Sequence, residues 1–176
     1  MNVVQQKNSC GTCRECCKFL TITAPQDNEL QAQRVKKWIT EGKDTKVPPT
    51  PCPQLNRSLL VSGCSIHKEE TKPELCNNYL CLYALGSIKN KSNRPDKCGL
   101  IIDAFGDRKV FRIVETKEEA LEKNKELLWN IHRAGHLLGE EWAVEIIPYN
   151  LLGTDTGTRH IISEAGLSIG KKNDNK

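Results

Sequence analysis

Cys10-Gly11-Thr12-Cys13-Arg14-Glu15-Cys16-Cys17 is the stretch on which the fold of the first hundred residues depends. A two-residue spacer between cysteines lets one turn direct two sulfurs at a single metal ion. Three cysteines at successive spacers of this kind also match the first part of the bacterial ferredoxin run, in which thiolates hold iron. The fourth ferredoxin position is occupied by Leu20. The remaining ligands must therefore come from distant cysteines.

The chain has nine cysteines in 176 residues, and none follows residue 98. The start of the chain lacks the apolar stretch of a secretory signal, and no apolar run approaches the roughly 20 residues that span a bilayer. In a reducing compartment, clustered cysteines favour metal binding or redox chemistry over structural disulfides. We therefore expect a soluble cytoplasmic protein that does not enter a membrane and whose thiols bind a metal.

The adjacent pair Cys16 and Cys17 needs separate treatment. Neighbouring Cα atoms lie about 3.8 Å apart, whereas unstrained disulfides need at least about 4.4 Å. Side chains at successive positions also diverge, both in helices and in strands. We expect one of the two to be a primary ligand, while the other serves a second site or packs behind the first ligands.

The downstream cysteines complete the predicted ligand set. Eight thiolates could form two four-thiolate sites or one cluster with spare thiols, and the spacing leaves both open. Cys98 lies outside the dense pattern, and we expect it to be a small buried apolar residue. The predicted metal ligands are Cys10, Cys13, Cys16, Cys17, Cys52, Cys64, Cys76 and Cys81.

The order of these cysteines resembles the YkgJ-type cysteine-cluster family. The similarity spans residues 10–81 and includes the opening Cys-x-x-Cys-x-x-Cys-Cys, the segments Cys52-Pro53-Gln54-Leu55 and Cys64-Ser65-Ile66-His67, and Cys76-x4-Cys81. His67 stands where the family usually has tyrosine, and Lys72 stands where it has arginine. The family is described as a zinc- or iron-chelating domain. The resemblance therefore implies metal chelation but no defined biochemical role.

The sequence is compatible with three functions. The leading hypothesis is an iron–sulfur protein with a [4Fe–4S] cluster. The second is a structural zinc module that binds a protein partner, whose identity the sequence does not indicate. The third is a redox enzyme that uses a spare thiol such as Cys17 or Cys98. No catalytic motif is present, so enzyme activity stays undecided, and a scattered net charge of +4 gives little reason to expect nucleic-acid binding.

Other polar groups are weaker candidates. His132 and His136 are four residues apart, with Glu140 on the same stripe, but they are expected on a partly exposed polar face. His67, three residues after Cys64, could complete a Cys/His site or hydrogen bond to a thiolate. The basic segment 89–97 would favour thiolates if it lay near the cysteines, but a solvated turn is the preferred interpretation.

The sequence pattern predicts an α+β fold in which short helices cover an irregular cysteine-rich metal module. A helix is expected over Asp27–Glu41, capped by Asp27 and Asn28 and ended by Gly42. The proline-rich segment 47–53 should present Cys52 from an extended loop, and 58–61 should be a short strand. The apolar stripe of the helix comprises Leu30, Val35, Trp38 and Ile39.

Beyond Cys98 a hairpin–helix–strand unit is expected. Segments 100–105 and 109–114 should form the hairpin, and 143–147 a third strand. Thr116 and Glu119 match a capping box that opens the intervening helix. The predicted domains are a metal module over 1–99, the hairpin unit over 100–152 and a flexible tail over 153–176. The helix should bury Leu127, Ile131, Ala134 and Leu138 and stop at Gly139.

Overall fold

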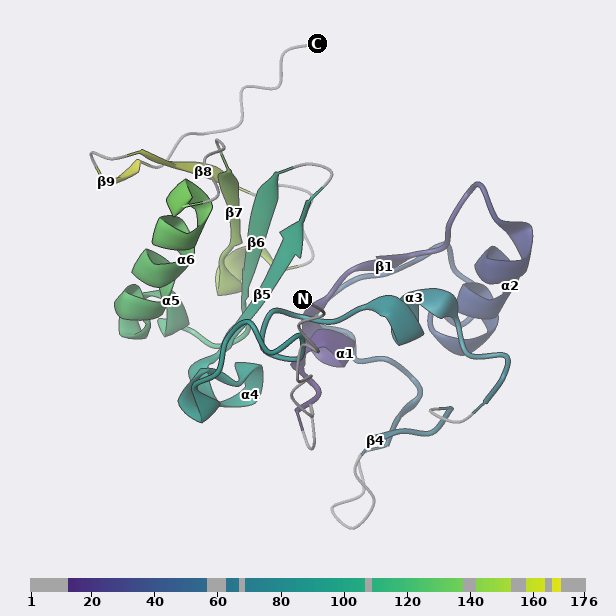
Figure 1. Cartoon of the computed structure of the whole chain (residues 1–176). Coiled ribbons are helices and arrows are strands. Elements are labelled where there is room, and N and C mark those ends of the chain that lie inside the picture. The colour runs from purple at the N-terminus through teal and green to yellow at the C-terminus, as the bar shows by residue number, and fades with distance from the viewer. Residues whose placement is uncertain are drawn as a thin grey trace, which may run out of the picture. The chain divides into compact units, whose positions relative to one another are not determined.

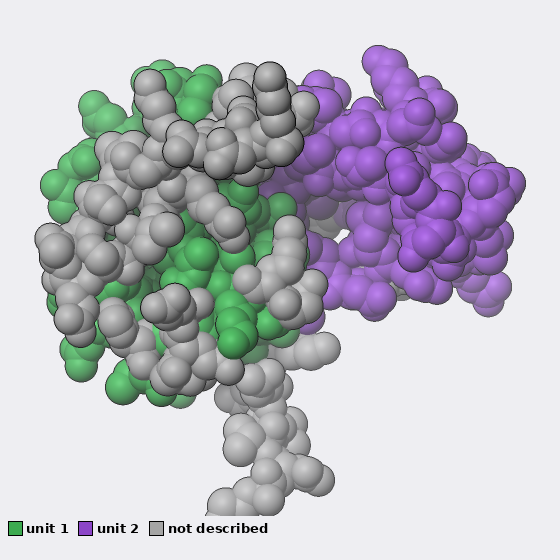
Figure 2. All heavy atoms as spheres, turned by 90° about the horizontal axis from the view of Figure 1, so that it is seen from above, with its two compact units in different colours: residues 1–8, 81–176 green, residues 9–80 purple. Residues whose placement is uncertain are grey.

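The computed structural model describes residues 13–56, 63–66, 69–106, 109–137, 142–152, 158–163 and 166–168. The chain divides into two compact units, coloured separately in Figure 2. The cysteine unit is residues 9–80, and the sheet unit is residues 1–8 with 81–176. The protein has mixed α and β structure, with short helices in both units, as the sequence predicted.

The cysteine unit is built from short elements (Figure 1). Its two sheets have two strands each: β1 pairs with β2, and β3 pairs with β4, both antiparallel. The elements are α1 (Glu15–Phe19), β1 (Ile22–Thr23), α2 (Glu29–Trp38), β2 (Thr45–Lys46), β3 (Leu55–Asn56), β4 (Gly63–Cys64) and α3 (Glu74–Asn78).

Helix α2 begins where its cap predicts. The Asn28 side chain accepts a hydrogen bond from the Gln31 amide at 3.1 Å, which satisfies one of the free N–H groups of the first turn. Val35 is fully buried, as expected, but Leu30 is 58% exposed, so its place in the apolar stripe was wrong. Gln31 is buried instead, and its amide oxygen accepts from the Glu74 backbone at 3.0 Å, which ties α3 to α2.

The sheet unit contains a five-stranded sheet in the order β5-β6-β7-β8-β9. The predicted hairpin is confirmed, with Leu100 opposite Glu115 and Phe105 opposite Val110. Strands β6 and β7 are parallel, because α5 and α6 provide the crossover between them (Figure 1). The strands are β5 (Leu100–Phe105), β6 (Val110–Glu115), β7 (Ala143–Ile147), β8 (Thr158–Ser163) and β9 (Gly166–Ser168); the helices are α4 (Pro95–Cys98), α5 (Ala120–Lys123) and α6 (Lys125–Leu137), with 3-10 turns η1 (Lys91–Asn93) and η2 (Tyr149–Leu151).

Helix α6 packs on the sheet to form the main core. Leu127 and Ile131 are buried as predicted, whereas Ala134 is exposed and Gly135 is buried in its place. A Cβ at Gly135 would lie 3.3 Å from the Trp142 Cβ, which shows how closely the helix approaches this residue. Buried members of this core are Leu82, Leu100, Ile102, Phe111, Ile113, Ala120, Leu127, Ile131, Val144 and Ile146.

The predicted capping box at Thr116 is wrong. Glu119 has a left-handed backbone (φ 59°), and no side chain caps α5 at this position. The buried Glu115 carboxylate accepts two other backbone N–H bonds, from Leu121 and Tyr149, each at 3.0 Å. Glu115, at the end of β6, therefore caps the first turn of α5 through the Leu121 amide and also binds the Tyr149 amide.

The observed units differ from the predicted domains in two places. The boundary lies at residue 80 rather than 99. Residues 81–99 belong to the sheet unit, since the Leu82 amide donates to the Ile102 carbonyl of β5 at 2.8 Å. Two segments of the predicted tail are strands, β8 and β9. The expected strand over 58–61, Leu138 and Gly139 lie outside the described residues. None of the described helices combines the length and apolarity needed to cross a membrane.

Candidate thiol site

Helix α1 carries the vicinal pair Cys16 and Cys17. The helix has only five residues, and the Cys17 amide donates to the Arg14 carbonyl at 3.1 Å. A hydrogen bond from the Cys16 thiol to Cys17, followed in effect by the charges of Lys46, Lys72 and Arg14, lowers the pKa of Cys17 to about 7 against the opposing effect of burial. The two side chains therefore interact, whereas the sequence argument expected them to diverge.

Cys52 is brought to α1 by the proline-rich loop. The Cys52 amide donates to the Cys17 carbonyl at 2.9 Å, and the Cys52 carbonyl accepts from the Leu55 amide at 3.0 Å. The side chain is buried, with 8% of its surface exposed. Burial raises the pKa of the Cys52 thiol, and the negative charges of Cys17 and Cys64 act in the same direction. The predicted extended loop thus presents Cys52 to the interior of the cysteine unit.

Cys64 and Cys76 come from two further elements. The β3–β4 pairing places Cys64 opposite Leu55, and the Ser65 amide donates to the Gln54 carbonyl at 2.8 Å beside it. Cys76 lies on α3 and packs against the same apolar cluster as Cys17. Burial, followed by the charge of Cys52, raises the pKa of Cys76 to about 12, although Lys72 acts in the opposite direction.

Two buried lysines accompany these thiols. Lys46 is 4% exposed and Lys72 is 8% exposed. The Ile22–Lys46 pairing of β1 and β2 positions Lys46, whose Nζ donates to the Thr50 carbonyl at 2.9 Å. Burial lowers the pKa of Lys46, while the charges of Cys52, Cys17 and Cys16 raise it. Both lysines act electrostatically on Cys17, so cationic and sulfur groups share one region.

The cysteine side chains that the structure describes in this unit have the chemistry of metal ligands, but their sulfur atoms lie too far apart to bind one metal ion. Five cysteines (16, 17, 52, 64 and 76) belong to one unit and are linked to each other by a hydrogen bond or by charge interactions. Thiolates are the ligands that zinc and iron–sulfur clusters prefer. Among the described residues, however, no three His, Cys, Asp or Glu side chains lie close enough together to hold a metal ion. Metal binding would have to draw these sulfurs closer.

The remaining predicted ligands are Cys10, Cys13 and Cys81. Cys10 is outside the described residues, and Cys13 is half-buried just before α1. Cys81 is the first residue of the second part of the sheet unit, where it is buried and its carbonyl accepts from the Leu85 amide at 2.9 Å. None of the eight described cysteines forms a disulfide.

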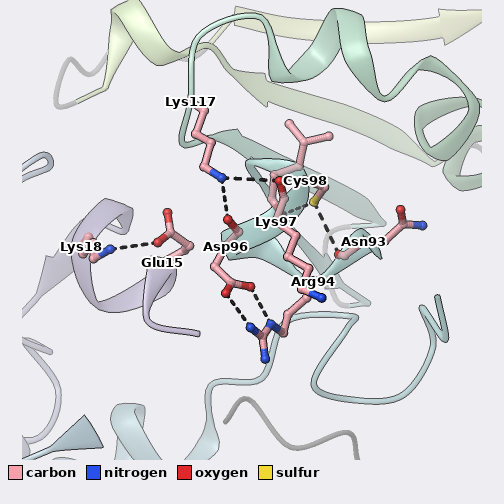
Figure 3. Close-up of polar contacts among 9 residues, drawn as sticks. Glu15, Lys18, Asn93, Arg94, Asp96, Lys97, Cys98 and Lys117 are labelled. Carbon is pink, nitrogen blue, oxygen red and sulfur yellow. Dashed lines mark hydrogen bonds and ion pairs between the residues drawn. The ribbon is translucent and has the colours of Figure 1, made fainter. Parts of the chain in front are cut away.

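Cys98 and its basic neighbours form a structural cluster at the start of the sheet (Figure 3). The Cys98 thiol points to the Asn93 carbonyl at 3.4 Å and packs against the main core. Arg94 holds the Asp96 carboxylate with two hydrogen bonds of 2.6 and 2.7 Å. Lys117 donates to the Asp96 carbonyl at 2.5 Å and so satisfies a backbone oxygen of α4. Within the predicted basic segment, Arg94 is therefore paired with Asp96 of the same segment.

Of the histidine candidates, the structure describes the side chain of His132 but not that of His136. His132 is half-buried, and its ring centroid lies 5.5 Å from that of Trp129. His67 and Glu140 lie outside the described residues. The partial exposure of His132 agrees with the partly exposed polar face that was expected for this helix.

The sequence argument missed Lys46 entirely. A lysine between Thr45 and Val47 has no local property that marks it as buried. The sequence argument noted Lys72 only because the YkgJ-type family usually has arginine at that position. A cationic residue in both cases was the one sequence signal that pointed to Lys72.

Comparison with known proteins adds no relative: no family model, no curated protein and no solved structure matches this chain. The resemblance to the YkgJ-type family therefore rests on the order and spacing of the cysteines.

Proposed function

We propose that the cysteine unit is a metal-binding module whose thiolates hold an iron–sulfur cluster. The observation that carries this proposal is the convergence of five thiols from α1, the proline-rich loop, β4 and α3 in one unit. Their side chains come from residues up to 60 positions apart (Cys16 to Cys76, 76 − 16 = 60). The local turn spacing explains why neighbouring cysteines approach, and a shared metal site would explain why the distant ones join them.

The free-energy cost of the thiolates supports the same proposal. Several thiolates in a protein interior are costly unless a cation compensates them. Cys52 and Cys76 have raised pKa values because burial and neighbouring negative charge disfavour their ionised forms. A metal ion or cluster would displace these protons and supply the missing positive charge.

Cys16, Cys17, Cys52, Cys64 and Cys76 are the residues that would hold the group, with Cys10 and Cys13 as further ligands from the same unit. An iron–sulfur cluster would supply one-electron transfer. The chain's own contribution is to orient the thiols and to surround them with the apolar side chains of Val35, Ile39 and Leu55.

Anaerobic purification of the full chain tests the proposal directly. An iron–sulfur protein should contain iron and acid-labile sulfide and show a visible absorption band. A colourless protein with stoichiometric zinc would instead support the structural zinc module, which the same convergence of thiols favours as the second candidate. Absence of any bound metal after reconstitution with iron and sulfide, and with zinc, would contradict both.

A further inference from the structure

Lys46 and Lys72 are buried in the cysteine unit, where an ammonium group needs a counter-charge. Removing a charge from water costs several kcal/mol unless a partner compensates it. Among the residues that the structure describes, no carboxylate forms an ion pair with Lys46 or Lys72. The Lys46 Nζ has one carbonyl partner, that of Thr50, which carries no net charge. The fold thus retains two cations at a place where an apolar side chain would be less costly.

The groups that can supply negative charge to these lysines are cysteines. The Lys46 Nζ donates to the carbonyl of Thr50, two residues before Cys52, and the Cys52 amide donates in turn to the Cys17 carbonyl at 2.9 Å. Lys72 directly precedes Pro73, whose carbonyl accepts from the Cys76 amide at 3.0 Å. In agreement with this placement, Cys16, Cys17 and Cys52 act electrostatically on Lys46, and Lys72 acts on Cys17 and Cys76. The lysines come from different elements, Lys46 from β2 and Lys72 from the turn before α3. The thiol cluster is therefore exposed to positive charge from two separate parts of the unit.

The charge of a metal–thiolate centre matches this arrangement. Four thiolates around one divalent metal leave two negative charges in excess. An oxidised [4Fe–4S] cluster held by four thiolates has the same excess, and nearby charge influences its potential. We propose that Lys46 and Lys72 neutralise an anionic four-thiolate metal centre in the cysteine unit and so determine its affinity. This inference rests on the proposed metal-binding function and names the charge of the centre that the site accepts.

Arg14 is a third cation near Cys17, but it is half-buried and more open to screening by solvent. Lys18 pairs with the buried Glu15 at 3.0 Å, so its charge is compensated (Figure 3). Lys46 and Lys72 are thus the two cations whose removal should change the centre most.

The test uses the reduced full chain under anaerobic conditions, with Co²⁺ alone as the probe. Cobalt–thiolate absorption in the near ultraviolet reports binding directly, and a competing chelator gives the Kd. Lys46→Met and Lys72→Met remove each charge while keeping an unbranched side chain. Lys43→Met makes the same substitution on an exposed lysine of the same unit and serves as the matched control.

Each buried-lysine variant should weaken Co²⁺ binding by about tenfold, since charges in a protein interior interact with an effective dielectric constant well below that of water. Lys43→Met should change the Kd by less than about twofold, because exposed charges are screened. Lys46→Arg should retain most of the affinity. The thermal midpoint of the metal-free chain should stay the same or rise in Lys46→Met, because an uncompensated buried charge has been removed.

Two results would overturn the inference. One is a wild-type chain that binds Co²⁺ through thiolates while both methionine variants bind it as well as Lys43→Met. The other is an equal loss of affinity in Lys46→Arg and Lys46→Met, which would assign the effect to packing. A wild-type chain without a cobalt–thiolate band would instead contradict the proposed function itself, so the two failures are distinguishable. Circular dichroism of each metal-free variant identifies any that fails to fold. If one of the two methionine variants does so, the other methionine variant, compared with Lys43→Met, decides the question.

Discussion

The sheet unit and the cysteine unit differ in what their interiors contain. The sheet unit buries long strands against α6, with Leu100, Ile101 and Ile113 at 1% exposure or less. In the cysteine unit, the strands have two residues each, the apolar cluster is small and includes cysteines, and Lys46 and Lys72 are buried. Apolar burial can therefore stabilise the sheet unit without a bound group. The cysteine unit contains ammonium and thiolate groups, which are costly to bury unless an opposite charge compensates them.

Removing the metal should produce the largest difference between the two units. A structural zinc site contributes about 10–16 kcal/mol of apparent binding free energy to folding. Treatment of the metal-loaded chain with a chelator should therefore accelerate amide hydrogen exchange strongly in residues 13–56 and 69–80, and little in β5 and β6. Hydrogen-exchange mass spectrometry measures both. If hydrogen exchange accelerated equally in the two units, the cysteine unit would depend on metal no more than the sheet unit does.

Ile113→Ala should weaken the sheet unit alone. Ile113 is 1% exposed and lies in the main core, so truncation should reduce the free energy of unfolding by about 2–5 kcal/mol. Denaturant unfolding followed by Trp129 and Trp142 fluorescence measures the loss. Ile113→Val is the matched control, with an expected loss of about 0.5–1.5 kcal/mol. A fall in Co²⁺ affinity in Ile113→Ala would show that the thiol site depends on the sheet core.

Thiol titration should separate Cys17 from Cys76 in the metal-free chain. Because the pKa of Cys17 is about 7 rather than 9.0, its alkylation rate should rise around pH 7, whereas Cys76, with a pKa of about 12, should stay unreactive at pH 9. Peptide mapping by mass spectrometry after timed alkylation reads both thiols. Cys16→Ala removes the largest cause and should move the Cys17 midpoint upward. An unchanged midpoint would exclude the Cys16 hydrogen bond as the cause.

The same pKa has a consequence for stability. The folded state releases the Cys17 proton at lower pH than the unfolded state, so the stabilisation is present above pH 9 and is lost as pH falls from 9 through about 7. The difference corresponds to at most about 3 kcal/mol. Urea unfolding of the metal-free chain at pH 6.5 and 9 should show this increase, and it should be smaller in Cys17→Ser.

Asn28→Ala should have the smallest effect. Loss of the side-chain cap of α2 should cost about 1 kcal/mol, because one N–H group of the first turn loses its partner. Asn28→Asp keeps an acceptor and should preserve most of the stability. Hydrogen exchange of the Gln31 amide measures the change locally. If Asn28→Ala exchanged no faster than the wild type, the cap would not stabilise this helix.

The parts of the fold predicted from sequence are those that local chemistry determines. The start of α2 follows from the Asn28 cap, and the hairpin of β5 and β6 follows from two apolar runs around a short turn. Long-range contacts decided the points that were missed. Gln31 is buried because its amide reaches the Glu74 backbone, and Glu115 replaces Thr116 because its carboxylate reaches both Leu121 and Tyr149.

The candidate site shows the same division. Spacing singled out the cysteines, and it could do so because a Cys-x-x-Cys turn is a local geometry. Which distant thiols join them depended on the backbone contact between Cys52 and Cys17 and on the packing of Cys76 against the same cluster. The strands β8 and β9 exist through pairing with β7 and with each other, which a Gly- and Thr-rich composition does not indicate.

The amino-acid sequence by itself determined that this protein has an α+β fold and a dense set of thiols in its first hundred residues. Only the tertiary structure decided that Lys46 and Lys72 are buried beside those thiols. The physical reason is that a thiol-rich turn is a property of a few consecutive residues. Burial of a charge depends on every segment packed around it, and no stretch of sequence contains that information.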